Sequence, residues 1–196
     1  SSNNYGIYLY SSSNNTITGN TCNNNSNYGI YLYESNNNTV TGNTCNNNSS
    51  GIRLYSSSNN TVTGNTCNDN NAGIHLSSSS NNNTVTGNTC NNNGNGIHLS
   101  SSSNNTVTGN TCNNNNYSGI RLYSSSKNTI TGNTCIRGTG TPGDYTTNQY
   151  TIALSGTDNN YNLITSNNCM GKAVVIEGGT GNSAWGNKFD NTNDLS

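Results

Sequence analysis

The sequence predicts an all-β fold: a right-handed parallel β-helix of about eight coils, with 22 or 23 residues per coil. One unit repeats six times, made of Gly-Ile-x-Leu, a serine-rich stretch, Asn-Thr-(Ile/Val)-Thr-Gly-Asn-Thr-Cys and an asparagine-rich stretch. No part of the unit has the 3.6-residue period that the helical half of a leucine-rich repeat requires. The third observation is the spacing of 22 or 23 residues between the cysteines that end the units, Cys22, Cys45, Cys67, Cys90, Cys112 and Cys135.

Each unit contains two short strands in which apolar and polar residues alternate, as in Ile7-Tyr8-Leu9 and Thr16-Ile17-Thr18. Parallel coils lie about 4.8 Å apart, so equivalent inward residues stack into continuous apolar columns. The expected core columns are Ile7, Ile30, Ile52, Ile74, Ile97 and Ile120; Leu9, Leu32, Leu54, Leu76, Leu99 and Leu122; and Ile17, Val40, Val62, Val85, Val107 and Ile130.

Two further columns consist of asparagine, which tolerates left-handed bends and can hydrogen-bond along a stack. We assign them to structure. They are Asn15, Asn38, Asn60, Asn83, Asn105 and Asn128 before the Thr-x-Thr strand, and Asn20, Asn43, Asn65, Asn88, Asn110 and Asn133 after it.

The chain is predicted to be a single domain over residues 1–196, with regular coils at 1–135, an inserted loop at 136–149 and degenerate coils at 150–196. Trp185 and Phe189 occur only in the last coil, where we expect them to cover the end of the solenoid. No comparable cap precedes the first coil. Its open edge is therefore expected to pair with upstream sequence or with another molecule.

Composition limits the partners and the location. With 27% hydrophobic and 7% charged residues and a net charge of -1, the chain has no basic stripe for nucleic acid and no apolar run for membrane insertion. Its polar residues are fixed in position, which indicates an ordered solenoid and not a disordered tract. The chain starts at Ser1 without an apolar signal segment, so we expect a processed secreted or cell-surface protein, or a piece of a longer one.

Seven cysteines, the six of the repeats and Cys169, occupy one position of the coil. Two interpretations remain open, a column of buried thiols or disulfide pairs, and the thiols are favoured because in-register strands hold the Cβ atoms too far apart for a bridge. A straight column does not converge on a tetrahedral ion. We predict no metal and no cofactor.

The repeat units resemble the NosD-like β-helix repeats of the pectin-lyase-like superfamily, on the residues of the Gly-Ile-x-Leu and Asn-Thr-(Ile/Val)-Thr-Gly-Asn segments. The resemblance covers nearly the whole chain and implies the β-helix fold. It implies no single function, since the superfamily includes polysaccharide lyases, epimerases, adhesins, tailspikes and structural solenoids. The cysteine column departs from the usual pattern, in which an aliphatic residue is common.

The first candidate site is an outward array of threonines, stiff at χ1, on the Thr-x-Thr strands. It resembles the ice-binding faces of solenoid antifreeze proteins, and this resemblance implies ice or ordered water as the partner. Ice binding is the function the sequence favours, although threonine is also simply a good residue for an exposed strand. The array consists of Thr16, Thr18, Thr39, Thr41, Thr61, Thr63, Thr84, Thr86, Thr106, Thr108, Thr129 and Thr131.

The second candidate site is an aromatic and basic strip on the other strand, able to stack on sugar rings and to pair with carboxylates. It consists of Tyr8, Tyr31, Arg53, His75, His98 and Arg121. The second function that remains open is a structural or adhesive cell-surface protein, which binds glycans along this strip or self-associates through its first coil. A polysaccharide lyase is the third alternative, but no carboxylate in the strip would orient a histidine. The sequence therefore predicts a protein that is not an enzyme, with no catalytic residue.

Overall fold

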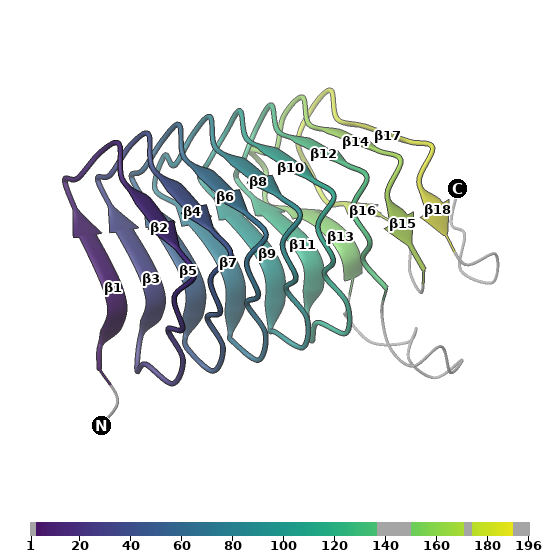
Figure 1. The fold of residues 1–196 in the computed structure, drawn as a ribbon. Coiled ribbons are helices and arrows are strands. Elements are labelled where there is room, and N and C mark those ends of the chain that lie inside the picture. The colour runs from purple at the N-terminus through teal and green to yellow at the C-terminus, as the bar shows by residue number, and fades with distance from the viewer. Residues whose placement is uncertain (1–2, 137–149, 171–173, 190–196) are drawn as a thin grey trace.

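The computed structural model describes residues 3–136, 150–170 and 174–189. These residues form a parallel β-solenoid of strands and turns without a helix, whose coils follow one another from the N-terminal to the C-terminal end (Figure 1). The described residues contain no apolar helix of membrane-spanning length. The predicted all-β solenoid is confirmed.

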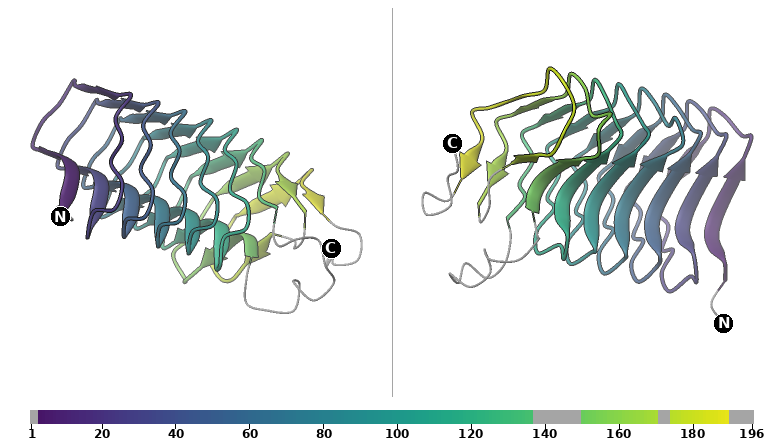
Figure 2. Two further views of the ribbon diagram at one scale, coloured as in Figure 1. Left: turned by 60° about the horizontal axis from the view of Figure 1, so that its bottom comes forward. Right: turned by 180° about the vertical axis from the view of Figure 1, so that it is seen from behind.

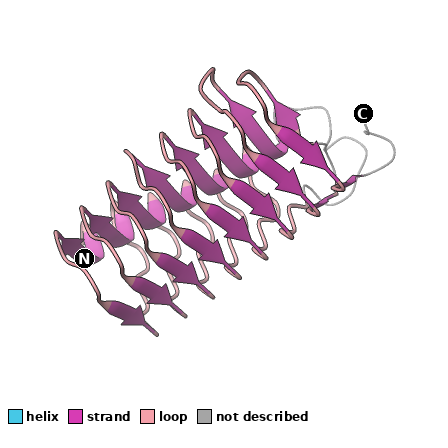
Figure 3. Ribbon diagram, turned by 90° about the horizontal axis from the view of Figure 1, so that it is seen from above, coloured by secondary structure: helices cyan, strands magenta, loops and turns pink. Residues whose placement is uncertain are grey.

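Two eight-stranded parallel sheets run along the solenoid, and Figure 3 shows their strands as two rows. Sheet A consists of β1 (Tyr5–Tyr10), β3 (Tyr28–Tyr33), β5 (Ser50–Tyr55), β7 (Ala72–Ser77), β9 (Asn95–Ser100), β11 (Ser118–Tyr123), β13 (Tyr150–Ser155) and β16 (Val175–Ile176). Sheet B consists of β2 (Thr16–Thr18), β4 (Thr39–Thr41), β6 (Thr61–Thr63), β8 (Thr84–Thr86), β10 (Thr106–Thr108), β12 (Thr129–Thr131), β14 (Leu163–Thr165) and β17 (Ser183–Trp185). A third, two-stranded sheet pairs β15 (Asn168–Cys169) with β18 (Lys188–Phe189).

The core lies between the sheets and consists of the predicted columns. From the second coil on, their isoleucine, leucine and valine side chains are fully buried, whereas Ile7 and Leu9 of the first coil are only partly covered. Register is strict, with Ile52 opposite Ile74 and Leu54 opposite Leu76. Because each coil buries its apolar residues only against its neighbours, the solenoid is held together by stacking.

Asparagine side chains continue the stacking through the bends. The predicted columns are confirmed: Asn38 Oδ1, for example, accepts bonds from the backbone N and Nδ2 of Asn15, 2.8 and 3.1 Å away. The sequence analysis missed a third asparagine column, in which Asn48 Oδ1 accepts from the backbone N of Asn25 at 2.9 Å. This column continues through Asn70, Asn93 and Asn115.

The glycine of each Gly-Ile-x-Leu segment is required by the close approach of the next coil's backbone and, at Gly51, of a cysteine side chain. A Cβ atom on Gly51 would lie 2.7 Å from the carbonyl oxygen of Gly73 and 2.9 Å from Cys67 Cβ. Both distances are shorter than real Cβ contacts. Glycine, which has no side chain, therefore lets the strand pass close to the next coil's backbone and to the cysteine that points into the interior of its own coil.

The C-terminal coil differs from the prediction. Trp185 pairs with Thr165 on the outer side of sheet B, and its side chain is 62% exposed instead of covering the solenoid end. The physical reason is register, because Trp185 takes the outward position that threonine holds in earlier coils. The side chain of Phe189 and residues 137–149 of the predicted loop lie outside the described residues.

Candidate functional site

The outer face of sheet A brings together the aromatic and basic strip that the sequence predicted. Its six members occupy one outward column, each opposite the next on neighbouring strands: Tyr8, Tyr31, Arg53, His75, His98 and Arg121. The strands alternate, so the isoleucine and leucine on either side of each member point into the core. Figure 2 shows these strands side by side from behind.

Tyrosines form a stacked surface over the first coils, which we call the tyrosine platform. Tyr8 and Tyr31 stack with ring centroids 5.1 Å apart at 14°, and Tyr33 stacks on Tyr55 at 5.2 Å and 3°. Tyr8 is 46% exposed, so part of its ring faces solvent. The platform consists of Tyr5, Tyr8, Tyr10, Tyr28, Tyr31, Tyr33 and Tyr55. The sequence analysis did not place Tyr5 and Tyr28 on this face because they precede the Gly-Ile segment.

Next along the same column lies a pair of histidines held by an arginine. Arg53 Nη1 donates to Nδ1 of His75 at 2.6 Å, and Arg53 Nη2 donates to the Ser77 hydroxyl at 3.0 Å. A guanidinium group can only donate, so Nδ1 of His75 must carry the lone pair and Nε2 the hydrogen. His75 stacks on His98 with ring centroids 4.6 Å apart.

Both imidazoles are neutral at pH 7. Burial, together with electrostatic repulsion from a protonated His98 and from Arg53, lowers the pKa of His75 to about 2. Burial, with the charges of Arg121 and Arg53, lowers the pKa of His98 to about 4. The fixed positive charges on this face are therefore those of the two arginines.

Several polar atoms on the strands that carry Arg53, His75 and His98 are buried without a hydrogen-bond partner in the described part of the chain. They are Arg53 Nε, His75 Nε2, His98 Nε2 and Asn95 Oδ1. Asn95, on the same strand as His98, is only 8% exposed. Buried polar groups are normally paired, and unpaired ones in a native structure require an explanation. We call the group of Arg53, His75 and His98, which bond or stack in sequence, the central site.

Beyond the central site, Arg121 borders a cavity of about 200 Å³. Arg121 Nε donates to the Ser155 hydroxyl at 3.2 Å, and the guanidinium lies 5.9 Å from the centroid of the Tyr123 ring. The cavity also brings in Glu177, an exposed carboxylate that the sequence analysis did not connect to the strip. No sequence signal marked it, since it comes from the degenerate coils. The lining residues are Tyr117, Ser118, Arg121, Tyr150, Ala153, Ser155 and Glu177.

The threonine array lies on the outer side of sheet B. Each Thr-x-Thr strand pairs in register with the next, as Thr61 with Thr84 and Thr63 with Thr86. The regular array covers the six strands from β2 to β12 and ends at Leu163, which takes the place of the first threonine in β14. A third column, Thr21, Thr44, Thr66, Thr89, Thr111 and Thr134, is joined by parallel bridges.

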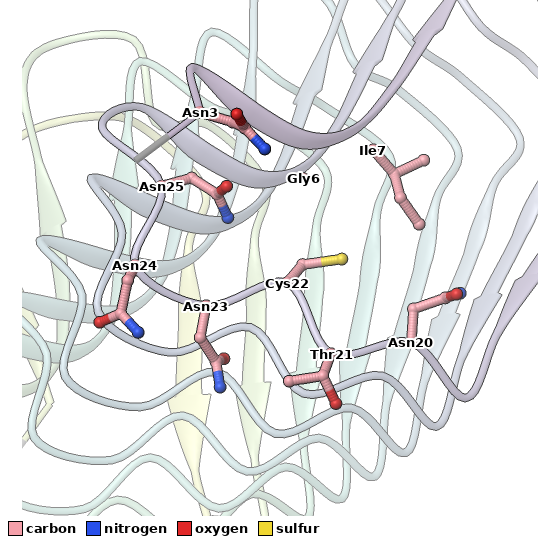
Figure 4. Close-up of a pocket in the computed structure, with 9 residues that line it drawn as sticks. All are labelled: Asn3, Gly6, Ile7, Asn20, Thr21, Cys22, Asn23, Asn24 and Asn25. Carbon is pink, nitrogen blue, oxygen red and sulfur yellow. The ribbon is translucent and has the colours of Figure 1, made fainter. Parts of the chain in front are cut away.

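The interior holds all seven cysteines as free, buried thiols. A hydrogen bond with Cys45, together with burial, raises the pKa of the Cys22 thiol well above its ordinary value. Burial raises the pKa of Cys169 to about 11. A cavity of about 710 Å³ lies at the open side of the first coil, where the Cys22 sulfur is turned toward Ile7 (Figure 4).

Comparison with known proteins fits this architecture. Residues 1–111 match the family described as right-handed β-helix region, and residues 77–196 match the family described as periplasmic copper-binding protein (NosD). The chain belongs to the right-handed β-helix and NosD families. No curated protein matches this NosD-type β-helix protein by sequence. The resemblance to the pectin-lyase-like superfamily is thereby confirmed.

Solved structures share the fold of the NosD-type β-helix protein. A double mutant of the periplasmic alginate epimerase AlgG has a TM-score of 0.73 at 22% identity, with 95% of this chain and 48% of that chain covered. The Azotobacter vinelandii mannuronan C-5 epimerase AlgE6 A-module has a TM-score of 0.70 at 15% sequence identity, with 91% of this chain and 57% of that chain covered. DFA-IIIase from Arthrobacter chlorophenolicus A6 has a TM-score of 0.70 at 19% sequence identity, with 84% of this chain and 44% of that chain covered. The chain thus spans about half the length of these structures.

These structures correct the prediction that the NosD-type β-helix protein is not an enzyme. The solved structures it resembles are carbohydrate-active enzymes, two alginate epimerases and DFA-IIIase. The prediction rested on a single feature, the lack of a carboxylate beside the histidines. That feature alone was not sufficient to exclude an enzyme. At 15 to 22% identity the likeness itself establishes the shared fold.

The copper in the NosD family description can be tested against the side chains. In the described part of the chain, no group of three or more His, Cys, Asp or Glu residues is placed to hold a metal ion. His75 and His98 stack face to face, and Nδ1 of His75 is bonded to Arg53. The planar nitrogen and oxygen set that Cu²⁺ prefers is therefore not formed at the histidines.

Proposed function

We propose that this protein binds an acidic polysaccharide along the outer face of sheet A and acts on it at the central site. The observation that carries the proposal is the continuity of three surfaces along the outer face of sheet A: the tyrosine platform, the central site with its unpartnered polar atoms, and Arg121. Periplasmic AlgG and the periplasmic NosD family fit the predicted location outside the cytoplasm.

The tyrosine platform is suited to sugar rings. Stacked phenol rings present flat apolar surface while their hydroxyl groups remain available to hydrogen-bond, which is how aromatic residues hold amphipathic ligands. Tyr8 and Tyr10 are 46% and 60% exposed, so their rings are accessible. Because neighbouring coils repeat the same surface, the platform extends along the solenoid axis and suits a linear chain.

The central site is suited to a carboxylate. The guanidinium of Arg53 carries a fixed positive charge. The Nε2–H group of His75 is a hydrogen-bond donor without an acceptor among the described residues. A bound uronate would supply acceptors to both groups and restore the hydrogen bonds that burial removed. Such a carboxylate would also raise the pKa of His98 toward the range in which an imidazole exchanges protons. His98, whose nitrogens Arg53 does not bond, is then the group placed to take a proton from the sugar.

The test is calorimetric titration of the protein with uronate oligosaccharides and with neutral glucose oligosaccharides of equal length. We expect binding of the uronates only, weakened about 3- to 10-fold by Tyr8→Ala, because a stacked aromatic contributes about 0.5–1.5 kcal/mol. Arg53→Gln should weaken it about 10-fold or more, since it removes a charge-assisted bond of about 1.5–3 kcal/mol.

Tyr161→Ala is the matched control, because Tyr161 is also an exposed tyrosine (63%, against 46% for Tyr8) but lies in the turn before β14. It should leave uronate affinity unchanged. Equal affinity for neutral and acidic oligosaccharides, or equal effects of the two tyrosine variants, would contradict the proposal. The chemical step is tested separately. Uronate oligosaccharides are incubated with the wild-type protein or with His98→Gln, and the products of the two incubations are compared.

A second candidate function, ice binding, rests on the register of the threonine array. Six consecutive strands present threonine pairs that align from coil to coil, about 4.8 Å apart, on a face free of charged side chains within those strands. Regular methyl groups and hydroxyl groups on stiff side chains form a surface able to hold ordered water.

Thermal hysteresis of the purified chain tests this second function. Thr63→Tyr should abolish hysteresis and ice shaping, because one large ring interrupts the middle of the flat array. Ser100→Tyr is the control, since the same sheet A column already carries Tyr55 and Tyr123. Rounded crystals with the wild-type protein would rule out ice binding.

A further inference from the structure

The cavity beside Arg121 arises from a change in side-chain size between neighbouring coils. On the outer face of sheet A, Arg121 lies opposite Ala153, and Tyr123 lies opposite Ser155. Two large side chains of β11 are thus followed by two small ones of β13. The space that the small side chains leave is the cavity of about 200 Å³, which Ala153 and Ser155 line together with Arg121.

Two side chains of opposite charge line this cavity. Arg121 Nε donates to the Ser155 hydroxyl at 3.2 Å, which fixes the guanidinium, while its two Nη groups bond no residue of the described chain. Glu177, whose side chain is exposed, follows Ile176, the residue of β16 that pairs with Leu154 of β13. The cavity therefore lies between a cation with free donors and a carboxylate that can only accept.

We propose that this cavity binds the terminal uronate unit of the polysaccharide chain. The inference rests on the proposed function and deepens it, because it assigns the end of the chain to a defined place on sheet A. The carboxylate of the unit pairs with the free edge of the Arg121 guanidinium, whose planar fork matches a carboxylate. The ring lies against Tyr117, an exposed side chain that also lines the cavity.

Glu177 is the reason that the bound unit is terminal. It lies two strands beyond Arg121 in sheet A, about 10 Å along the solenoid axis, so it faces the end of a chain that follows that axis. A terminal uronate presents a free hydroxyl group there, and a carboxylate accepts a hydrogen bond from it. A chain that continued would bring a second uronate carboxylate close to Glu177, and such like charges repel each other.

The two arginines of the strip set the register of the chain. Arg53, His75, His98 and Arg121 occupy consecutive strands, so Arg53 and Arg121 are three coils, or about 14 Å, apart. An extended chain of sugar rings advances by about one coil spacing per ring. When the terminal unit meets Arg121, the fourth unit from the end therefore meets Arg53. Four units are the shortest chain that engages both guanidinium groups.

The experiment is calorimetric titration of the protein with homogeneous uronate oligosaccharides of increasing length. Wild-type affinity should rise at least about 10-fold from three units to four, because the second charge-assisted contact then forms within the same complex. Arg121→Gln should remove this step, while the trimer still binds at Arg53. Ser155→Tyr should remove it as well, because the ring fills the cavity. The same column already carries Tyr55 and Tyr123, and circular dichroism should show an unchanged β-sheet signal.

Lys127→Gln is the matched control, since it removes the same charge from an exposed position in the turn before β12. It should leave the step between three and four units in place. Binding of no uronate at any length would overturn the proposed function and this inference together. Binding without the step, or a step that survives in Arg121→Gln, would overturn the inference alone.

Much longer uronate chains test the assignment of the chain end. With the affinity of the four-unit chain, one wild-type molecule should bind per chain whatever the chain length. Glu177→Gln removes the repulsion, so with this variant the number of bound molecules should increase with chain length. A number that already increases with length for the wild type would show that internal units occupy the cavity, and it would overturn the inference.

Discussion

Replacement of Asn65 by leucine is expected to lower the free energy of unfolding by about 4 kcal/mol, although leucine has nearly the same size. Asn65 Oδ1 accepts from the backbone N and Nδ2 of Asn43 at 2.9 and 3.0 Å. Its Nδ2 donates to the carbonyl oxygens of Val40 and Thr63 and to Asn88 Oδ1, at 2.9 to 3.1 Å. Leucine leaves these buried groups unpaired, at about 1–3 kcal/mol each for those that find no other partner.

Urea unfolding followed by circular dichroism measures this loss, which is a large part of the stability of a typical domain. Asn47→Asp is the matched control. Asn47 is exposed in the left-handed conformation (φ 57°), and the next coil already carries Asp69 at the equivalent position (φ 58°). This control should change stability by less than about 0.5 kcal/mol. A loss below about 1 kcal/mol for Asn65→Leu would mean that the asparagine column does not stabilise the fold.

Acidification from pH 7 to pH 5 is expected to destabilise the folded protein by about 4 kcal/mol through two histidines. The pKa of His75 is lowered to about 2 and that of His98 to about 4 by burial and by neighbouring positive charges, against about 6.5 in the unfolded chain. Below pH 6.5 the unfolded chain therefore binds more protons than the folded one, so stability is complete above pH 6.5 and is lost as pH falls. Each group contributes about 2 kcal/mol at pH 5.

The profile is measured by urea unfolding at closely spaced pH values between 7 and 5, above the range in which most carboxylates titrate. His98→Gln should halve the slope, and the double variant His75→Gln/His98→Gln should flatten it. Lys127→Gln removes a positive charge that does not come from a histidine, and it should leave the slope of stability against pH unchanged. A flat wild-type profile would contradict the burial of neutral imidazoles at the central site.

The sequence repeat was sufficient to predict most of the fold, because equivalent residues pack in the same way in every coil. The positions of Ile52, Val62 and Asn65 within one unit predicted their burial in every unit, since a solenoid contacts only its neighbours. Where the repeat degrades, this reasoning weakened. Trp185 was expected over the end of the solenoid, but register with Thr165 turns it outward.

The candidate site was predicted only as a column of residue types. Its chemistry depends on how side chains reach across strands: Arg53 crosses to the next coil to bond His75 and thereby fixes which imidazole nitrogen carries the hydrogen. The position of Glu177 beside Arg121 also depends on packing. The prediction that the protein is not an enzyme was overturned by the solved structures that share its fold, which are carbohydrate-active enzymes.

The sequence by itself determined the coil, the identity of each column and the residues that face outward, because strand periodicity and a constant repeat length leave little freedom of register. Only the tertiary structure decided which atoms meet between coils. It stacked the tyrosines, buried two neutral imidazoles with unpartnered nitrogens, and left the seven buried cysteines as free thiols. These are properties of distances between residues 22 or more positions apart, and such distances exist only once the coils have stacked.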